Sequence, residues 1–459
     1  MNFAFYDLET TGISTAFDQP LQFAAILTDG DFREIERVNL RCRIAPHVIP
    51  SPWALAVTGV RPAQLLDPNL PSLFEFTQDI AALIQRWSPA TWTGFNSIHF
   101  DEEMLRQAFY QNLQPDIFAT QFNGNTRLDV LTALYAVWYR QPDLLKWPID
   151  ETGRVRFKLD RIAPLNGFTA HNAHDALGDV EATIHLARQI AQGVPDLWAE
   201  LLANRDKGNV QGRLASFQPM ALVERFGGGP PRATIGCYCG TSTSNANQAA
   251  FFDLEAADPA DFLAADDAVL FAAVDASPKT IRSLATNKSP ALIALPTPSA
   301  ELTRRSEIIA NAPELRARVA KALASRFPED PSAPPPPVEK QIFGGFYSNA
   351  DKALLADFQR TDWPRRQEIA SSLADPRLRQ LGRRLVAFHA PALLSPDERC
   401  QYDAWLRTRW SAADAPEIEW LTVERSRHAI TDMRSGGGID PGLIDEIEVY
   451  MQGFDSHAR

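Results

Sequence analysis

The opening segment constrains the fold of this chain most, because an apolar strand there ends in two acids. Residues 3–9 read Phe-Ala-Phe-Tyr-Asp-Leu-Glu, and Thr-Thr-Gly follows at once. Successive side chains of a strand point to opposite faces, so Asp7 and Glu9 emerge side by side on one face. Like charges this close repel unless a cation lies between them or water surrounds them. The pair indicates either a Mg²⁺ or Mn²⁺ site or a strand that runs out into a polar turn.

Length and composition set the domain organisation and the cellular location that we expect. A chain of 459 residues is too long for one ordinary hydrophobic core, so we expect two or three domains. No apolar run reaches the ~20 residues of a membrane span, and the first residues lack the features of a secretory signal. We therefore expect a cytoplasmic protein without a membrane partner. The net charge of −12 argues against coating nucleic acid with the whole surface, but a local basic cleft stays possible.

The first ~190 residues alternate between strand and helix patterns, which predicts an α/β domain. Apolar strands are expected near residues 3–8 and 21–29, and a helix near 73–87. A further helix should run from about Asp101, since apolar residues recur there at helical spacing. These residues are Met104, Leu105, Ala108, Phe109 and Leu113. Asp101 would lie at the N-terminus of this helix, either as its capping residue or as a metal ligand.

A helix near the end of this region carries another acid and follows a histidine. Its apolar stripe consists of Leu177, Val180, Ile184, Ala187 and Ala191. Asp179 would lie on the first turn. On one continuous helix His174 and Asp179 would point about 140° apart, so we predict His174 on a loop before the helix. There it is either a surface residue or a catalytic one.

The acids and the histidine together predict phosphodiester hydrolysis. Four carboxylates can hold two divalent ions roughly 4 Å apart, one activating water and the other stabilising the leaving oxygen. An imidazole with a pKa near 6.5 can deprotonate the attacking water at neutral pH. The candidate residues for these roles are Asp7, Glu9, Asp101, Asp179 and His174.

Residues 7–12, 96–101 and 174–179 resemble the three sequence motifs of the DEDDh 3′→5′ exonucleases. The resemblance implies that the four acids bind two Mg²⁺ ions, with Mn²⁺ as a substitute, and that His174 is the general base. Within that superfamily the chain is most similar to the bacterial exodeoxyribonuclease I family. This similarity implies release of 5′-mononucleotides from the 3′ end of single-stranded DNA, with a role in DNA repair and recombination.

The same resemblance implies three domains. They are a ribonuclease H-like exonuclease domain at residues 1–195, an SH3-like β domain at 200–340 and a helical domain at 345–459. Short apolar segments separated by Gly, Ser and Asn make the second region β-rich. One helix is expected around residues 300–327, and the proline run at 331–337 predicts a stiff spacer.

Substrate and partner contacts also follow from the resemblance. The substrate-binding residues that it implies are Leu8, Thr10, Phe100, Arg106, Arg127 and Lys158. The backbone at Leu8 and Thr10 would hold the terminal sugar. Phe100 and Trp53 are candidates to stack or wedge at the 3′-terminal nucleotide, and Phe100 is preferred because it adjoins Asp101. Charged residues of this kind also occur on solvated faces, and phenylalanine in the core. The expected partner is the C-terminal tail of single-stranded DNA-binding protein, and a monomer is expected.

Two other functions compete with this interpretation. A DEDDh exoribonuclease acting on short or structured RNA ends would share all five catalytic residues. Such relatives are typically short single domains, so the ~260 residues beyond the catalytic region favour the DNA enzyme. A non-catalytic binding platform with the same fold would have no need of four acids and a histidine.

Overall fold

The computed structural model describes residues 1–169, 175–327, 332, 334–412 and 417–458 of the chain. His174, predicted on a loop, lies outside these described residues. None of the helices in the described ranges is long and apolar enough to cross a membrane.

The first sheet has the strand order β3-β2-β1-β4-β5. Its antiparallel part consists of β1 (Phe3–Thr10), β2 (Pro20–Thr28) and β3 (Glu34–Arg41), and β4 (Thr91–Gly94) and β5 (Thr126–Asp129) add in parallel. The two strands expected at the start of the chain are therefore confirmed as β1 and β2. β1 is the central strand, and β4 pairs only with its residues 3–5, whereas β2 also pairs with Asp7 and Glu9 and so fixes the position of the acidic end.

Helices surround this sheet, and those predicted from the apolar periodicity are present. Ser72 and Glu75 form a reciprocal capping box that starts the predicted helix at residues 73–87. The next helix begins at Asp101, as expected. The helices of this part are α1 (Pro52–Thr58), α2 (Pro62–Leu65), α3 (Leu73–Trp87), α4 (Asp101–Gln111), α5 (Val130–Arg140), α6 (Leu159–Leu165) and α7 (Ala176–Gly193).

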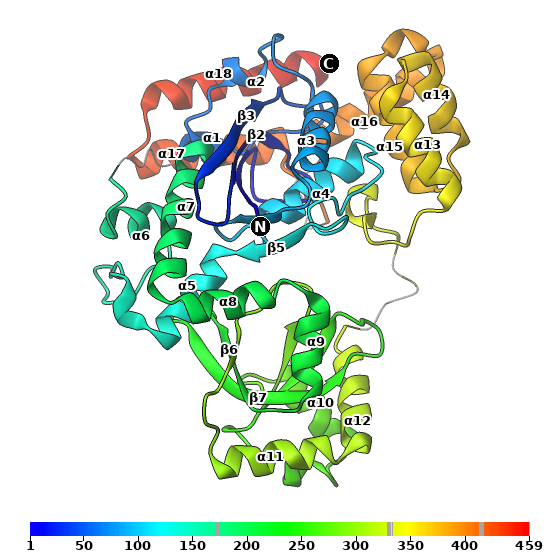
Figure 1. Cartoon of the computed structure of the whole chain (residues 1–459). Helices are drawn as coiled ribbons and strands as arrows, with labels where there is room; N and C mark the ends of the chain where they lie inside the picture. The colour runs from blue at the N-terminus through cyan, green and yellow to red at the C-terminus, as the bar shows by residue number, and fades with distance from the viewer. Residues whose placement is uncertain (170–174, 328–331, 333, 413–416, 459) are drawn as a thin grey trace.

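A second, fully antiparallel sheet has the order β10-β6-β7-β8-β9 and lies below the first in Figure 1. Its strands are β6 (Met220–Glu224), β7 (Arg232–Thr241), β8 (Gln248–Asp253), β9 (Ile281–Ala285) and β10 (Leu292–Ala294). The region also contains helices, which the strand-like pattern did not reveal. They are α8 (Pro195–Ala203), α9 (Lys207–Ala215) and α10 (Asp267–Asp275).

The single helix predicted around residues 300–327 is wrong in one respect, because the chain forms two helices there. They are α11 (Ala300–Ala310) and α12 (Pro313–Ala324). Pro313 occupies the first turn of α12 and has no backbone N–H to continue the preceding helix. The expected face of Leu315, Val319 and Leu323 is buried on α12.

The C-terminal part is helical, as predicted, and packs against the part of the molecule that contains the first sheet. Its helices are α13 (Asn349–Arg360), α14 (Trp363–Ser372), α15 (Pro376–His389), α16 (Pro396–Ser411), α17 (Val423–Gly436) and α18 (Pro441–Ala458). Figure 1 shows α17 and α18 running back over α1 and α2. Leu55 of α1 and Ile447 of α18 share one hydrophobic cluster.

The second sheet and the first share a continuous hydrophobic core. Val223 of β6 and Ile235 of β7 belong to the same buried cluster as Leu134 of α5 and Val180 of α7. Burial of apolar surface across this boundary stabilises the contact by about 25 cal/mol per Å². The hairpin formed by β6 and β7 is therefore held next to α5 and α7, beside the acidic end of β1.

Candidate active site

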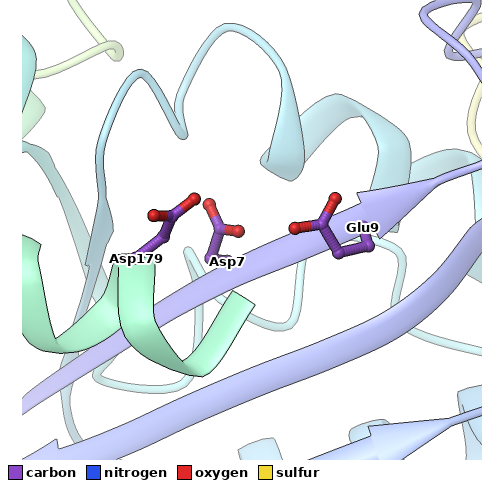
Figure 2. Close-up of side chains that lie close together, drawn as sticks. All are labelled: Asp7, Glu9 and Asp179. Carbon is purple, nitrogen blue, oxygen red and sulfur yellow. The ribbon is translucent and has the colours of Figure 1, made fainter. Parts of the chain in front are cut away.

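Three carboxylates meet at the end of β1. Asp7 and Glu9 come from alternate positions of the strand, and Asp179 comes from the first turn of α7. One oxygen from each lies within 4.8 Å of the others. Figure 2 shows the three side chains on the same side of β1. This arrangement offers a divalent cation three oxygen ligands, the type that Mg²⁺ and Mn²⁺ prefer.

Asp101 adjoins this cluster through a backbone hydrogen bond. It is buried as the first residue of α4, and the Leu8 amide donates to its Oδ1 at 3.1 Å. The residue at the capping position is Phe100, so Asp101 is not the capping residue that the sequence left open. A bond from the residue between Asp7 and Glu9 ties the fourth acid to the same strand end.

The surroundings of these acids favour their neutral forms. Burial, followed by the charges of Asp101, Asp179 and Glu9, raises the pKa of Asp7 well above its usual value. Burial and acidic neighbours raise the pKa of Glu9 to about 8, against a lowering effect of Arg41. Burial also raises the pKa of Asp101 to about 8, although the bond from Leu8 lowers it. The donor set therefore fits a bound divalent cation, which would favour the charged forms.

Asp129, at the end of β5, shapes the turn that precedes α4. Its carboxylate accepts from the amides of Asn96 at 3.0 Å and Ile98 at 3.1 Å, and it caps α5. Asn96 has a φ of 64°, a left-handed conformation that asparagine tolerates. Sequence analysis did not assign Asp129 a role. Its position at a strand end before an apolar helix was the available signal.

Arg106 and Arg127, which the resemblance placed near the DNA, are buried and turned toward Glu102. Their guanidinium groups lie 2.8 and 3.3 Å from Glu102 Oε1, with 7% and 4% of their side chains exposed. Thr120 and Tyr6 also donate to this carboxylate, at 2.7 and 3.1 Å. Both arginines are buried because their partner, Glu102, lies within the fold. The sequence alone does not reveal this pairing.

The other expected substrate-binding residues lie around the strand end. Leu8 and Thr10 are buried, and the Thr10 hydroxyl donates to the Gly12 carbonyl at 2.8 Å. Phe100 is half-buried against the core. Lys158 is exposed and lines a cleft together with Asp179.

The predicted general base cannot be placed relative to these acids, because residues 170–174 are outside the described part. The next residue, Asp175, lies close to the cluster. Gln22 donates to its Oδ1 at 3.2 Å, and its charge contributes to the raised pKa of Glu9.

Comparison with protein families gives two matches along the chain. Residues 4–187 match a family described as Exonuclease, and residues 336–453 match the Exonuclease I C-terminal domain. Exodeoxyribonuclease I of Haemophilus influenzae is 28% identical over 98% of both chains. The chain belongs to the exodeoxyribonuclease I family. The Escherichia coli protein of this family is 27% identical over 89% of both chains.

Solved structures of exodeoxyribonuclease I agree with the fold. The Escherichia coli enzyme in complex with a dA16 oligonucleotide aligns over 99% of both chains, with a TM-score of 0.83 and 25% identity. Exonuclease I from Methylocaldum szegediense aligns over the full length of both chains with the same TM-score and 24% identity. The expected combination of an α/β exonuclease part, an antiparallel β part and a helical C-terminal part is thereby confirmed.

Membership of the exodeoxyribonuclease I family also confirms the predicted enzyme class, a 3′→5′ exonuclease. The family implies a divalent metal. Among the described residues, Asp7, Glu9 and Asp179 form a group of oxygen ligands that suits such an ion.

Proposed function

We propose that this protein degrades single-stranded DNA from its 3′ end and releases 5′-mononucleotides. The observation that carries the proposal is the cluster of Asp7, Glu9 and Asp179, with Asp101 joined to the same strand by a hydrogen bond from Leu8, in a chain with a full-length relative named exodeoxyribonuclease I. The dA16 oligonucleotide bound to the Escherichia coli relative supports a single-stranded DNA substrate. The expected biological role is DNA repair and recombination.

In this proposal the four acids Asp7, Glu9, Asp101 and Asp179 hold two Mg²⁺ ions, for which Mn²⁺ can substitute. Bound metal supplies the charge that activates water and stabilises the leaving oxygen. The chain's own contribution is to fix the acids in a buried strand end where few protein cations compete. His174 would take the proton of the attacking water. Leu8, Thr10, Phe100 and Lys158 would orient the terminal nucleotide.

Arg106 and Arg127, for which the resemblance implies contact with the DNA, are buried beside Glu102. We propose that Arg106 and Arg127 support the substrate site by holding Glu102, and with it the first turn of α4. Asp101 precedes Glu102 directly, so the network would keep this acid at the strand end. The division at residues 1–195, 200–340 and 345–459 is our proposed set of functional units. The tail of single-stranded DNA-binding protein remains the proposed partner, and a monomer the proposed state.

A degradation assay tests the proposal. Single-stranded DNA and RNA of equal sequence, labelled at either end, are incubated with Mg²⁺ or with EDTA. We expect rapid loss of DNA from its 3′ end with Mg²⁺ and none with EDTA. Faster loss of RNA would replace the DNA assignment by the exoribonuclease alternative, and activity in EDTA would exclude the metal mechanism.

The role of His174 has its own test. His174→Ala should lower turnover strongly, because no other group at the site is assigned to take the proton. Metal binding, followed by the thermal shift on addition of Mg²⁺, should stay intact. Unchanged turnover would remove His174 from the mechanism.

A further inference from the structure

An open cleft of about 530 Å³ lies beside the acidic cluster, where α5 and α7 meet the hairpin of β6 and β7. Asp179 lines it together with Lys158 and Arg225, and Tyr135 and Phe157 supply aromatic surface. Its volume lies within the ~300–1,000 Å³ that small-molecule sites occupy. The cleft is therefore large enough for a nucleotide unit next to one of the candidate metal ligands.

Arg225 enters this cleft from the end of β6, and two side-chain contacts hold it there. It directly follows β6, whose Val223 is buried in the core shared with the first sheet. Its Nε donates to the Gly229 carbonyl at 2.8 Å within the hairpin. Its guanidinium lies 5.3 Å from the centre of the Phe157 ring. The group is thus positioned by both parts of the molecule without a bond to an acid.

Among the described residues, Arg225 differs from the arginines near Lys158 because no carboxylate lies within salt-bridge distance of it. Arg156 and Arg161 lie on the same segment of the chain as Lys158, and each pairs with an aspartate. Asp160, which also lines the cleft, is the partner of Arg161 at 3.7 Å. Within the described ranges, neither Arg225 nor Lys158 has a carboxylate oxygen at salt-bridge distance. The cleft therefore presents two cations whose charge is not neutralised by a direct partner.

We propose that Arg225 binds a backbone phosphate of the nucleic acid strand in this cleft, with Lys158 as the second cation. The inference rests on the proposed function. A guanidinium group offers several N–H donors and is well suited to phosphate oxygens. The half-buried Tyr135 forms the adjoining surface for a base or sugar. By this contact the second sheet takes part directly in placing the strand against Asp179.

The alternative is that Arg225 only stabilises the hairpin, through Gly229 and Phe157. Salt dependence separates the two roles, because each phosphate contact to a single strand adds ~0.7 to the slope of log affinity against log salt concentration. A residue that only supports the hairpin leaves this slope unchanged.

The experiment measures binding rather than turnover. A fluorescent oligodeoxythymidine with a free 3′ end is titrated with the full-length protein in EDTA at several NaCl concentrations, and anisotropy gives the affinity. Arg225→Gln keeps a long side chain with N–H donors but removes the charge. We expect an affinity loss of about tenfold and a slope smaller by ~0.7. Arg225→Lys should keep the slope of the unmodified protein.

Arg232→Gln is the matched control, because it removes the same charge from the same hairpin. Arg232 is exposed at the start of β7, opposite Glu224, and does not line the cleft. Its slope should equal that of the unmodified protein. An unchanged slope in Arg225→Gln would overturn the inference, whether or not the affinity falls. Failure of the unmodified protein to degrade single-stranded DNA would instead overturn the proposed function, and it would be seen before any variant is made.

Discussion

Asp101 and Glu102 are neighbours on the first turn of α4, yet their surroundings shift the pKa of the two carboxyl groups in opposite directions. Both are buried. The pKa of Asp101 is raised to about 8, mainly by burial, with a backbone amide as the partner of one carboxylate oxygen. Burial also acts to raise the pKa of Glu102, but Arg106 and Arg127 lower it below its usual value. Two adjacent residues of one helix turn thus differ in whether guanidinium groups offset the effect of burial on the carboxyl group.

The difference indicates that some buried acids of this fold stabilise it, whereas others serve the proposed reaction. A buried carboxylate is tolerated when cations and hydrogen bonds satisfy it, as they do at Glu102. Asp7 and Glu9 lie close to Asp179, and burial together with the neighbouring acids raises the pKa of both, so an added cation would favour their charged forms. Loss of charge should therefore have opposite consequences for stability in the two clusters.

The largest effect is expected for Asp7→Asn, which breaks the acidic cluster. Loss of one metal ligand should lower kcat by about 10³-fold, because metal ions contribute several kcal/mol of charge stabilisation to the transition state. In EDTA the melting temperature should stay the same or rise, since one of the repelling charges is gone. Steady-state degradation and thermal unfolding measure the two quantities.

Asp143→Asn is the control for this variant, because Asp143 is exposed in a short 3-10 helix (Pro142–Leu144) away from the cluster. It should change neither quantity. A lower melting temperature for Asp7→Asn in EDTA would show that Asp7 stabilises the fold, and the proposed division between the clusters would not hold.

Glu102→Gln breaks the compensated cluster and should act mainly on stability. It leaves two buried guanidinium groups without their shared carboxylate, which costs about 3 kcal/mol or more of the free energy of unfolding. Arg127 retains its bond to the Asn287 carbonyl at 2.8 Å, so part of the network persists. Urea unfolding in EDTA gives the value. A loss below about 1 kcal/mol would mean that solvent reaches these arginines in solution.

Metal addition should stabilise the protein in a pH-dependent way. The pKa of Glu9 and of Asp101 is about 8 in the folded protein, above the value of an unfolded carboxyl group. The folded state therefore binds more protons between about pH 4 and pH 8, and metal-free stability falls as the pH rises through this window. Metal binding must displace these protons, so it becomes tighter over the same window.

The expected readout is the thermal shift between Mg²⁺ and EDTA, which should grow from pH 6 to pH 9. At 100 times its dissociation constant a ligand adds about 2.7 kcal/mol of stability. Asp7→Asn should largely abolish the shift. An equal shift at every pH in this range would contradict the raised pKa values and the metal site that explains them.

Local sequence patterns predicted on which face or turn of their elements the acids lie. Strand and helix periods are short, so a few residues suffice to define them. Alternation along β1 placed Asp7 and Glu9 on one face, and the apolar stripe of α7 placed Asp179 on its first turn. That these two elements meet depends on packing, which the sequence shows only through the family resemblance. The break before α12 had a local signal in Pro313, but the long apolar pattern concealed it.

Cations were harder to predict than acids, since their role depends on partners that are distant in sequence. The resemblance implies that Arg106 and Arg127 contact the DNA, and inside the fold both also lie within ion-pair distance of Glu102. Arg225 is the opposite case, because the sequence did not predict it at the substrate site and the structure places it in the cleft. Nothing near it in the sequence indicates a site, and it reaches the cleft beside Asp179 because β6 packs against α5.

Glu103 follows Asp101 and Glu102 on α4. Of these three acids, we expect its replacement to have the smallest effect on stability. Its side chain is 23% exposed and lies 3.4 Å from both Arg106 and Lys288, the latter from the loop between β9 and β10. Partly exposed ion pairs contribute about 0.2–1 kcal/mol. Glu103→Gln and Lys288→Gln should each cost no more than this, and a double-mutant cycle should give a coupling of the same size that weakens in 1 M NaCl. A coupling of several kcal/mol would place Glu103 with Glu102 among the compensated buried acids, and solvent exposure would then no longer explain why three successive carboxylates behave differently.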